Sequence, residues 1–189
     1  MYSIQSASRA AQSSSVESPA HGTVCDCSAD LPPRPAPTAA GCLRCGAMAD
    51  LVRAMESGEL PFLVADAMTT QLAATSKEEA LDEIVTHLVA AGVLDRHSAK
   101  EVVDALIHRE AMNSTGIGGG VAIPHTKHPQ VDRVVGTLAW SQAGLEFDSI
   151  DDQPVHLLVV LLAPLDQNRE HVQALAKVAR LMRPSITSR

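Results

Sequence analysis

The residues best suited to chemistry lie in the segment STGIGGGVAIPHTKH, residues 114–128, where four glycines precede a Pro-His pair. Imidazole is neutral and nucleophilic near neutral pH, with an ordinary pKa of about 6.5. Pro124 fixes its own φ and favours an extended backbone at Ile123, so His125 should emerge from a stiff segment. Such a histidine can accept a group covalently and pass it on. The alternative is an ordinary loop histidine that follows a glycine turn.

The glycines themselves, at positions 116, 118, 119 and 120, have three explanations. A phosphate-binding P-loop ends in Gly-Lys-Ser/Thr, but here the nearest lysine, Lys127, follows the histidine. A dinucleotide fingerprint follows a strand with the spacing G-x-G-x-x-G, and this segment has neither feature. The third explanation is close backbone approach by a partner surface or by a phosphoryl group seeking N–H donors. The spacing favours the third.

Two further residues could act with His125. Arg109 continues the Val102–Leu106 line at helical spacing, and a guanidinium there suits bidentate contact with phosphoryl oxygens. Its alternative is a salt-bridged surface arginine. His171 lies about one turn inside an expected helix, where the N-terminal end keeps a histidine neutral and attracts anions. Its alternative is a structural, half-buried histidine.

The other histidines are interpreted as structural or surface residues: His21, His87, His97, His108, His128 and His156. His125 and His128 have H-x-x-H spacing, which can bind a metal. No carboxylate or cysteine cluster joins them, so a metal site is the weaker interpretation.

Three helices and two strands are expected to position these residues. Helices are predicted at 76–92, 99–112 and 168–182, and strands at 134–140 and 154–164. Capping boxes begin the first two helices, Ser76 with Glu79 and Ser98 with Glu101, and Gly92 ends the first. The third helix is expected to turn these residues inward: Val172, Leu175, Ala176, Ala179 and Met182. Because residues 154–164 are apolar on both faces, that strand should be central and covered by helices on both sides. The pattern predicts an α/β or α+β sandwich with a mixed sheet.

Residues 1–58 differ in composition from the rest. They contain seven Val, Ile or Leu residues, no Phe or Trp, and the run LPPRPAPTAA. We expect most of this tail to be disordered, because it cannot bury enough apolar surface, although MADLVRAMESGEL could form a short helix. All four cysteines lie in it, at positions 25, 27, 42 and 45. They could form a small zinc site, but free thiols are favoured, because only the second pair has the usual spacing.

Net charge and hydropathy limit the classes of partner that the protein can have. The net charge of −7 argues against nucleic acid or an anionic membrane as a partner. The N-terminus has no apolar signal region, and the longest apolar run is about half of the ~20 residues that a membrane-spanning helix needs. A cytoplasmic protein without direct membrane insertion is expected.

The segment STGIGGGVAIPH resembles the active-site motif of the IIA components of the bacterial phosphoenolpyruvate-dependent sugar phosphotransferase system. The similarity is to the fructose/mannitol type, which includes the nitrogen-regulatory IIA proteins. Its signature, T-G-I/L-G-x-G-V/I-A-I/L-P-H, fits Thr115 to His125 without a gap. HRE before the loop and EHVQALAKVARL after the second strand match in order and spacing. The resemblance covers about residues 61–182.

The resemblance implies an α/β sandwich around a mixed sheet, in residues 59–189. His125 would accept the phosphoryl group on Nε2 from the phosphohistidine of the carrier HPr. His171 would donate a hydrogen bond to that group, and Arg109 would neutralise its charge. Thr115, Gly116, Gly118, Gly120 and Pro124 would form the active-site loop, with the glycines admitting the partner. No metal or organic cofactor is expected, because positioning and electrostatics carry such transfers.

The resemblance leaves three functions open. The first is a phosphoryl carrier that passes the group to a IIB domain, and the second is a regulatory module whose phosphorylation state a target protein reads. The third is a degenerate domain, which intact His125, Arg109 and His171 argue against. Two departures from the family are noted. The family domain continues beyond the third helix, so the C-terminal end is expected to be truncated, and the 58-residue tail is not part of the family domain.

Overall fold

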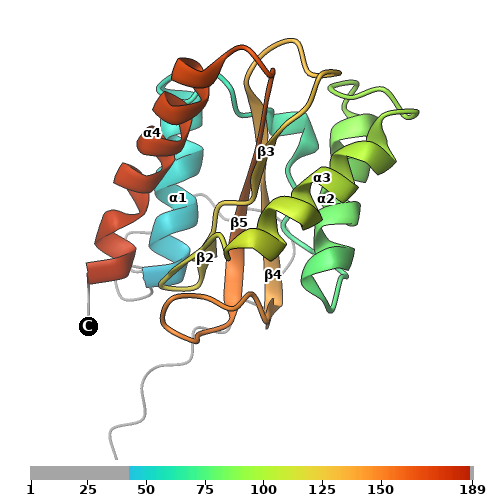
Figure 1. The fold of residues 1–189 in the computed structure, drawn as a ribbon. Coiled ribbons are helices and arrows are strands. Elements are labelled where there is room, and N and C mark those ends of the chain that lie inside the picture. The colour runs from blue at the N-terminus through green and yellow to red at the C-terminus, as the bar shows by residue number, and fades with distance from the viewer. Residues whose placement is uncertain (1–42, 188–189) are drawn as a thin grey trace, which may run out of the picture. The chain divides into compact units, whose positions relative to one another are not determined.

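Residues 43–187 are the part of the chain that the computed structural model describes, with side chains described for residues 48–182. A mixed β-sheet lies between two pairs of helices, α1 and α4 against one face and α2 and α3 against the other (Figure 1). The helices are α1 (Leu43–Glu56), α2 (Lys77–Ala90), α3 (Ala99–Met112) and α4 (Asn168–Thr187). The predicted α/β sandwich with a mixed sheet is confirmed.

The strand β5 (Val155–Ala163) lies at the centre of the sheet. On one edge it pairs parallel with β2 (Val121–Ala122) and β3 (His125–Lys127) in a single continuous register. On the other edge it pairs antiparallel with β4 (Val135–Leu145), and β1 (Gly116–Gly118) closes a hairpin with β2. β4 runs beyond the predicted 134–140, past an irregularity between Trp140 and Leu145.

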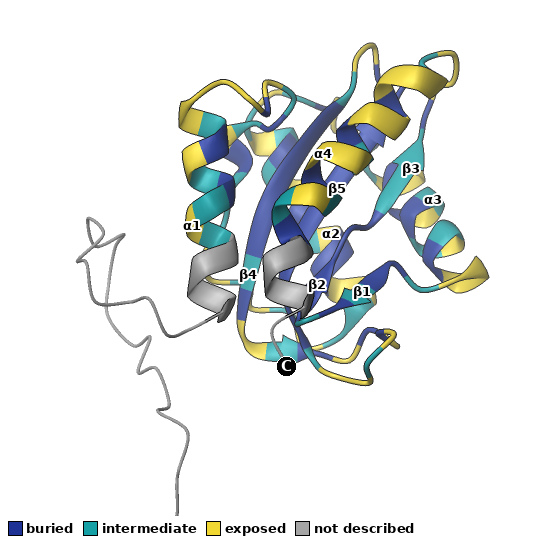
Figure 2. Ribbon diagram, turned by 90° about the vertical axis from the view of Figure 1, so that its left-hand side faces the viewer, coloured by how far each residue is buried: buried dark blue, intermediate teal, exposed yellow. Residues whose placement is uncertain are grey.

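The side chains of β5 divide the core in two. Leu158, Val160 and Leu162 pack towards α2 and α3, whereas Leu157, Val159 and Leu161 pack towards α1 and α4. This alternation is the two-residue period of a strand, and every residue of β5 is buried (Figure 2). The prediction of a central strand covered on both sides is confirmed.

Two details of the helix predictions are confirmed at α2. Ser76 caps the helix by accepting from the Glu79 N–H, and Glu79 completes the capping box. Gly92, just past the helix, has a φ of +71°, the left-handed conformation that glycine adopts readily. The second capping box is wrong. Ser98 lies in the right-handed helical region (φ −89°), so its side chain accepts no capping hydrogen bond from the described residues.

The predicted inward face of α4 is confirmed at Met182, Leu175 and Ala179, which pack against the core, and is wrong at two positions. Ala174, Val178 and Met182 are buried together with His171, whereas Val172 is 63% exposed and Ala176 is exposed. Small apolar residues occur on both sides of this helix, so the sequence pattern alone is compatible with either side facing the sheet. The side that faces β5 is the one whose buried residues repeat every three to four positions.

The packed region begins before the predicted boundary at residue 59. Leu51 and Ala54 of α1 are buried in the same core cluster as Val178 and Met182 of α4. α1 includes residues 48–56 of the segment 48–60 expected to form a short helix, and its packing adds it to the folded unit. The rest of the expected disordered tail, residues 1–42, lies outside the described residues, as do the side chains of all four cysteines.

Candidate active site

His125 begins β3, at the carboxyl end of the parallel strands. Its strand is held against β5 by a hydrogen bond from the Leu161 N–H to the Pro124 carbonyl oxygen. α4 starts a few residues after β5 ends, so its first turns come to the same end of the sheet. The carboxyl ends of strands in an open α/β sheet are where such folds place their ligands.

The His125 ring is oriented by its own backbone. Its Nδ1 lies 2.7 Å from the Ile123 carbonyl oxygen. A carbonyl only accepts, so Nδ1 carries the proton and the lone pair lies on Nε2. Burial lowers the pKa of His125, and the Arg109 charge lowers it further, while the Ile123 hydrogen bond and Glu110 oppose the shift. The result is a neutral imidazole with a nucleophilic Nε2.

His171 lies beside this ring. The two ring centroids are 5.5 Å apart, with the planes at 65°. His171 is 6% exposed, and its Nε2 has no hydrogen-bond partner among the described residues. Burial, followed by the charges of His125, Lys127 and Arg109, lowers its pKa to about 4. A neutral imidazole with an unpartnered buried nitrogen is suited to hydrogen-bond a group placed next to it.

Arg109 supplies charge to both rings from α3. Its guanidinium lowers the pKa of His125 and of His171, so its charge acts on both. Its Nη1 donates to the Asn113 carbonyl oxygen at 2.9 Å. The structure thus brings His125 and His171 side by side and lets the charge of Arg109 act on both, although the three residues come from three separate elements.

The glycine segment forms a tight hairpin between β1 and β2. Gly118, Gly119 and Gly120 all have positive φ, between +65° and +87°. A Cβ at Gly116 would lie 2.8 Å from the Ser149 Cα, and one at Gly118 would lie 3.1 Å from the Ile150 side chain. These two glycines therefore make room for residues 149–151 of the same chain.

The turn is also distant from His125. Residues 121–127 run extended along β5, so Gly120 lies roughly 16 Å from His125 at about 3.3 Å per residue. The role of the glycines in admitting a partner protein stays a prediction, because the surface of a protein partner can span this separation. They shape the hairpin from which the strand starts.

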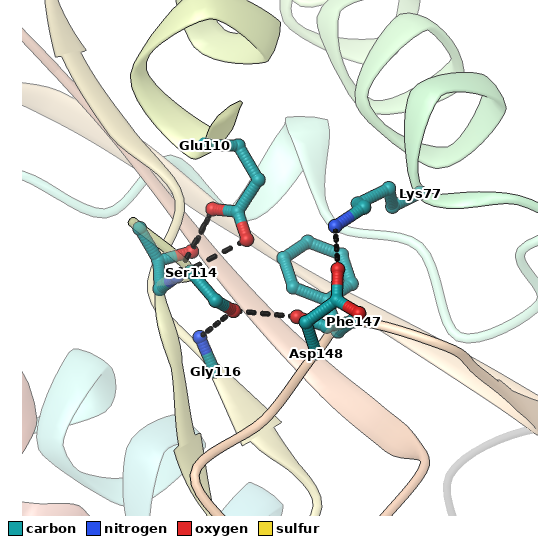
Figure 3. Close-up of polar contacts among 7 residues, drawn as sticks. Lys77, Glu110, Ser114, Gly116, Phe147 and Asp148 are labelled. Carbon is teal, nitrogen blue, oxygen red and sulfur yellow. Dashed lines mark hydrogen bonds and ion pairs between the residues drawn. The ribbon is translucent and has the colours of Figure 1, made fainter. Parts of the chain in front are cut away.

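Thr115 fastens this hairpin to α3. Its N–H donates to both carboxylate oxygens of Glu110 at 3.1 Å, and its hydroxyl donates to Oε2 at 2.6 Å. Figure 3 shows Glu110 near Ser114, whose hydroxyl bonds the Phe147 carbonyl oxygen and the Gly116 N–H. In the same view, Lys77 of α2 is paired with Asp148. These contacts tie α2, α3 and the hairpin together.

Sequence reasoning missed Lys127, Asn168 and Glu110 as parts of the site. The Lys127 ammonium donates to the Asn168 side-chain oxygen, at the start of α4. The available signal was the two-residue period of a strand, which puts His125 and Lys127 on the same face. Glu110 lies in the HRE segment that matches the family, whereas Asn168 carried no signal, since its contact depends on how α4 packs.

Two other histidines have structural surroundings, as expected. His128 is buried with its Nε2 3.6 Å from a Glu101 oxygen. His156 is buried and its Nδ1 lies 2.9 Å from the Ser141 carbonyl oxygen. Among the described residues, no helix has the length and apolar character needed to cross a membrane.

Comparisons with known proteins agree on one family. Residues 61–185 match the model of the family described as the phosphoenolpyruvate-dependent sugar phosphotransferase system, EIIA 2. A nitrogen regulatory protein of Bradyrhizobium diazoefficiens is 37% identical over 118 residues, which are 62% of this chain and 75% of that protein. The fructose-specific EIIABC component of Bacillus subtilis is 40% identical over 107 residues, 56% of this chain but only 16% of that protein.

Solved structures show the same relationship. The nitrogen regulatory protein IIA-Ntr from Neisseria meningitidis is 31% identical, with a TM-score of 0.57 over 66% of this chain and 82% of that one. The IIA mannitol protein from Escherichia coli, 22% identical with a TM-score of 0.52, shares the fold over 67% of this chain and 92% of its own. The family match spans most of the described domain, so this chain belongs to the EIIA type 2 family of the phosphoenolpyruvate-dependent sugar phosphotransferase system.

Proposed function

We propose that the protein is a cytoplasmic phosphoryl carrier whose acceptor is Nε2 of His125. The single observation that carries this proposal is the pairing of two neutral histidines. His125 has its proton at Nδ1 and its lone pair at Nε2. His171, whose ring centroid lies 5.5 Å from that of His125, has a buried Nε2 without a partner among the described residues. Family membership makes the protein a phosphotransfer carrier in general.

The transfer needs no proton to leave His125. Its Nε2 lone pair forms a bond to phosphorus while the bond from phosphorus to the donor's histidine nitrogen breaks, and that electron pair stays on the donor. The only N–H of His125 remains at Nδ1, in its hydrogen bond to Ile123. His171 then donates a hydrogen bond to a phosphoryl oxygen, and Arg109 offsets its charge.

The donor in this proposal is an HPr-like phosphocarrier, and the acceptor is a IIB domain or a regulatory target. A solved complex of the mannitol IIA and phosphorylated IIB enzymes of Escherichia coli shares the fold of this chain. The regulatory alternative is favoured by a specific observation, since several relatives at 37–42% identity are nitrogen regulatory proteins. In that case the phosphorylation state itself is the signal.

The test is the intact mass of the protein after incubation with phosphoenolpyruvate, enzyme I and HPr. We expect an acid-labile gain of one phosphoryl group in the parent and in His108→Ala, whose histidine is exposed and adjacent to Arg109. His125→Ala should show none while remaining folded. Labelling of His125→Ala would mean that the acceptor is another residue. A folded parent that takes up no phosphate would overturn the carrier function.

The phosphorylated parent then separates relay from regulation. It is mixed with an isolated fructose-type IIB domain, and the mass of both proteins is followed with time. Movement of the phosphoryl group to IIB supports the relay. Retention on His125 under conditions in which another IIA protein transfers its group supports the regulatory alternative.

A further inference from the structure

Lys127 is the second cation near the two histidines. It shares a face of β3 with His125, because side chains two residues apart on a strand point to the same side. It is partly buried, and its positive charge is one of the causes of the low pKa of His171. Its ammonium group therefore lies within electrostatic range of the space between His125 and His171.

In the unmodified protein this ammonium is held by a neutral group. Its Nζ donates to the side-chain oxygen of Asn168, the first residue of α4 and one turn before His171. The contact links β3 to the first turn of α4. Arg109 is held in a similar way, by the neutral Asn113 carbonyl oxygen. Both cations near the site thus have neutral acceptors while His125 is unmodified.

A phosphoryl group on His125 would change this balance. It brings about two negative charges and several acceptor oxygens, and hydrogen bonds to ionised acceptors are about twice as strong as those between neutral groups. An amide oxygen such as that of Asn168 cannot compete with such an acceptor for the same ammonium. Lysine is suited to such an exchange, since its charge sits on a flexible four-carbon stem.

We propose that Lys127 exchanges partners with the phosphorylation state, bonding Asn168 while His125 is unmodified and the phosphoryl group once His125 carries one. The inference rests on the proposed role of His125 and adds a residue that binds the phosphoryl group. It also gives the two states a structural difference. In the phosphorylated protein the first turn of α4, residues 168–172, loses its tie to β3, so a partner meets a different surface there.

The partner exchange predicts that substitutions of Lys127 and Asn168 change the extent of phosphorylation in opposite directions. Lys127→Gln removes the charge that the phosphoryl group attracts, so the ratio of phosphorylated to unmodified protein at equilibrium with the phosphocarrier should fall about tenfold. Asn168→Ala removes only the partner used in the unmodified state, so the same ratio should rise roughly threefold. Lys127→Arg keeps the charge and should restore most of the parent ratio.

The experiment measures this ratio by intact mass at several defined ratios of phosphorylated to free HPr, with thermal melting to verify folding. Lys177→Gln is the matched control. That lysine also lies on α4 and bonds a neutral oxygen, the Glu59 carbonyl, but lies away from the site. We expect it to leave the ratio unchanged. In a second readout, hydrogen exchange at residues 168–172 should rise on phosphorylation in the parent and be high in both states of Asn168→Ala.

The outcomes distinguish a failure of the proposed carrier function from a failure of the partner exchange at Lys127. A parent that takes up no phosphate refutes the proposed function, and this inference with it. If the parent is phosphorylated but both variants lower the ratio alike, Lys127 only ties α4 to β3 and the inference alone fails. An unchanged ratio in Lys127→Gln refutes it as well.

Discussion

The segment from β1 to β3 has two ends that differ in how their polar groups are used. At the glycine end, the carboxylates of Glu110 and Asp151 accept hydrogen bonds from the backbone N–H groups of Thr115 and Gly119. At the histidine end, the buried Nε2 of His171 has no partner among the described residues. Buried polar groups are normally bonded. Ser149 Oγ, which packs against Gly116, also has no partner among the described residues, so the nitrogen of His171 is distinguished by its place beside the neutral His125 ring. The glycine end builds the fold, and the histidine end is available for chemistry.

The largest expected effect tests the histidine end. His171→Leu should slow phosphoryl transfer to His125 on the order of 100-fold, because a hydrogen-bond donor to the phosphoryl group is lost. The same change should raise the melting temperature, since an apolar side chain of similar size removes a buried unpartnered nitrogen. The measurements are single-turnover transfer from phosphorylated HPr and thermal unfolding.

His128→Leu sharpens this test, because it replaces a buried histidine whose Nε2 lies near Glu101. It should lower the melting temperature and leave the transfer rate near that of the parent. If both leucine variants changed stability in the same direction, the distinction between partnered and unpartnered histidines would be lost.

The next effect tests the glycine end. Gly116→Ala should lower the free energy of unfolding by about 3 kcal/mol, because the new Cβ collides with the Ser149 Cα as well as with its hydroxyl oxygen, and the backbone atom cannot move aside by a rotamer change. At a temperature where the variant is folded, it should still accept a phosphoryl group. Urea unfolding measures the first quantity and intact mass the second.

Gly92→Ala is the control for the hairpin variant. Gly92 also has a positive φ, but a Cβ there meets no described atom within 4 Å. Only the left-handed conformation is penalised, so we expect a loss of about 1 kcal/mol. Equal losses of unfolding free energy at the two positions would show that the close contact with Ser149 does not contribute to the cost of Gly116→Ala.

The last test is the pH dependence of stability. Burial lowers the pKa of His171 to about 4 from an ordinary 6.5, so the unfolded chain binds more protons between these values. The contribution of this neutral histidine is therefore complete above pH 6.5, decreases as the pH falls to about 4, and is constant below that. The lowered pKa of His125 acts in the same direction.

Urea unfolding at pH 7.5 and pH 5 measures this slope. His171→Leu should show a smaller loss of stability at pH 5 than the parent, because one histidine that must take up a proton is gone. An identical loss in both proteins would mean that His171 titrates normally.

Much of the fold could be predicted from the sequence, because the long elements carry their own patterns. The Ser76 capping box, the glycine that ends α2 and the two-sided apolar run of β5 are local signals, and all three are confirmed. β1, β2 and β3 were missed, since two or three residues are too few to show a period. They are strands because they pair with each other and with β5. The rotation of α4, which exposes Val172, was likewise decided by packing.

By itself, the sequence determined the motif from Thr115 to His125, and with it the family and the candidate acceptor. The tertiary structure alone decided what surrounds that acceptor. The approach of His171, the orientation of the His125 ring and the partner of Lys127 all depend on α4 and β3 meeting at one end of β5. The physical reason is that desolvation and electrostatic interaction depend on distance in space. Residues far apart in the sequence therefore set the protonation of a histidine that the motif can only locate.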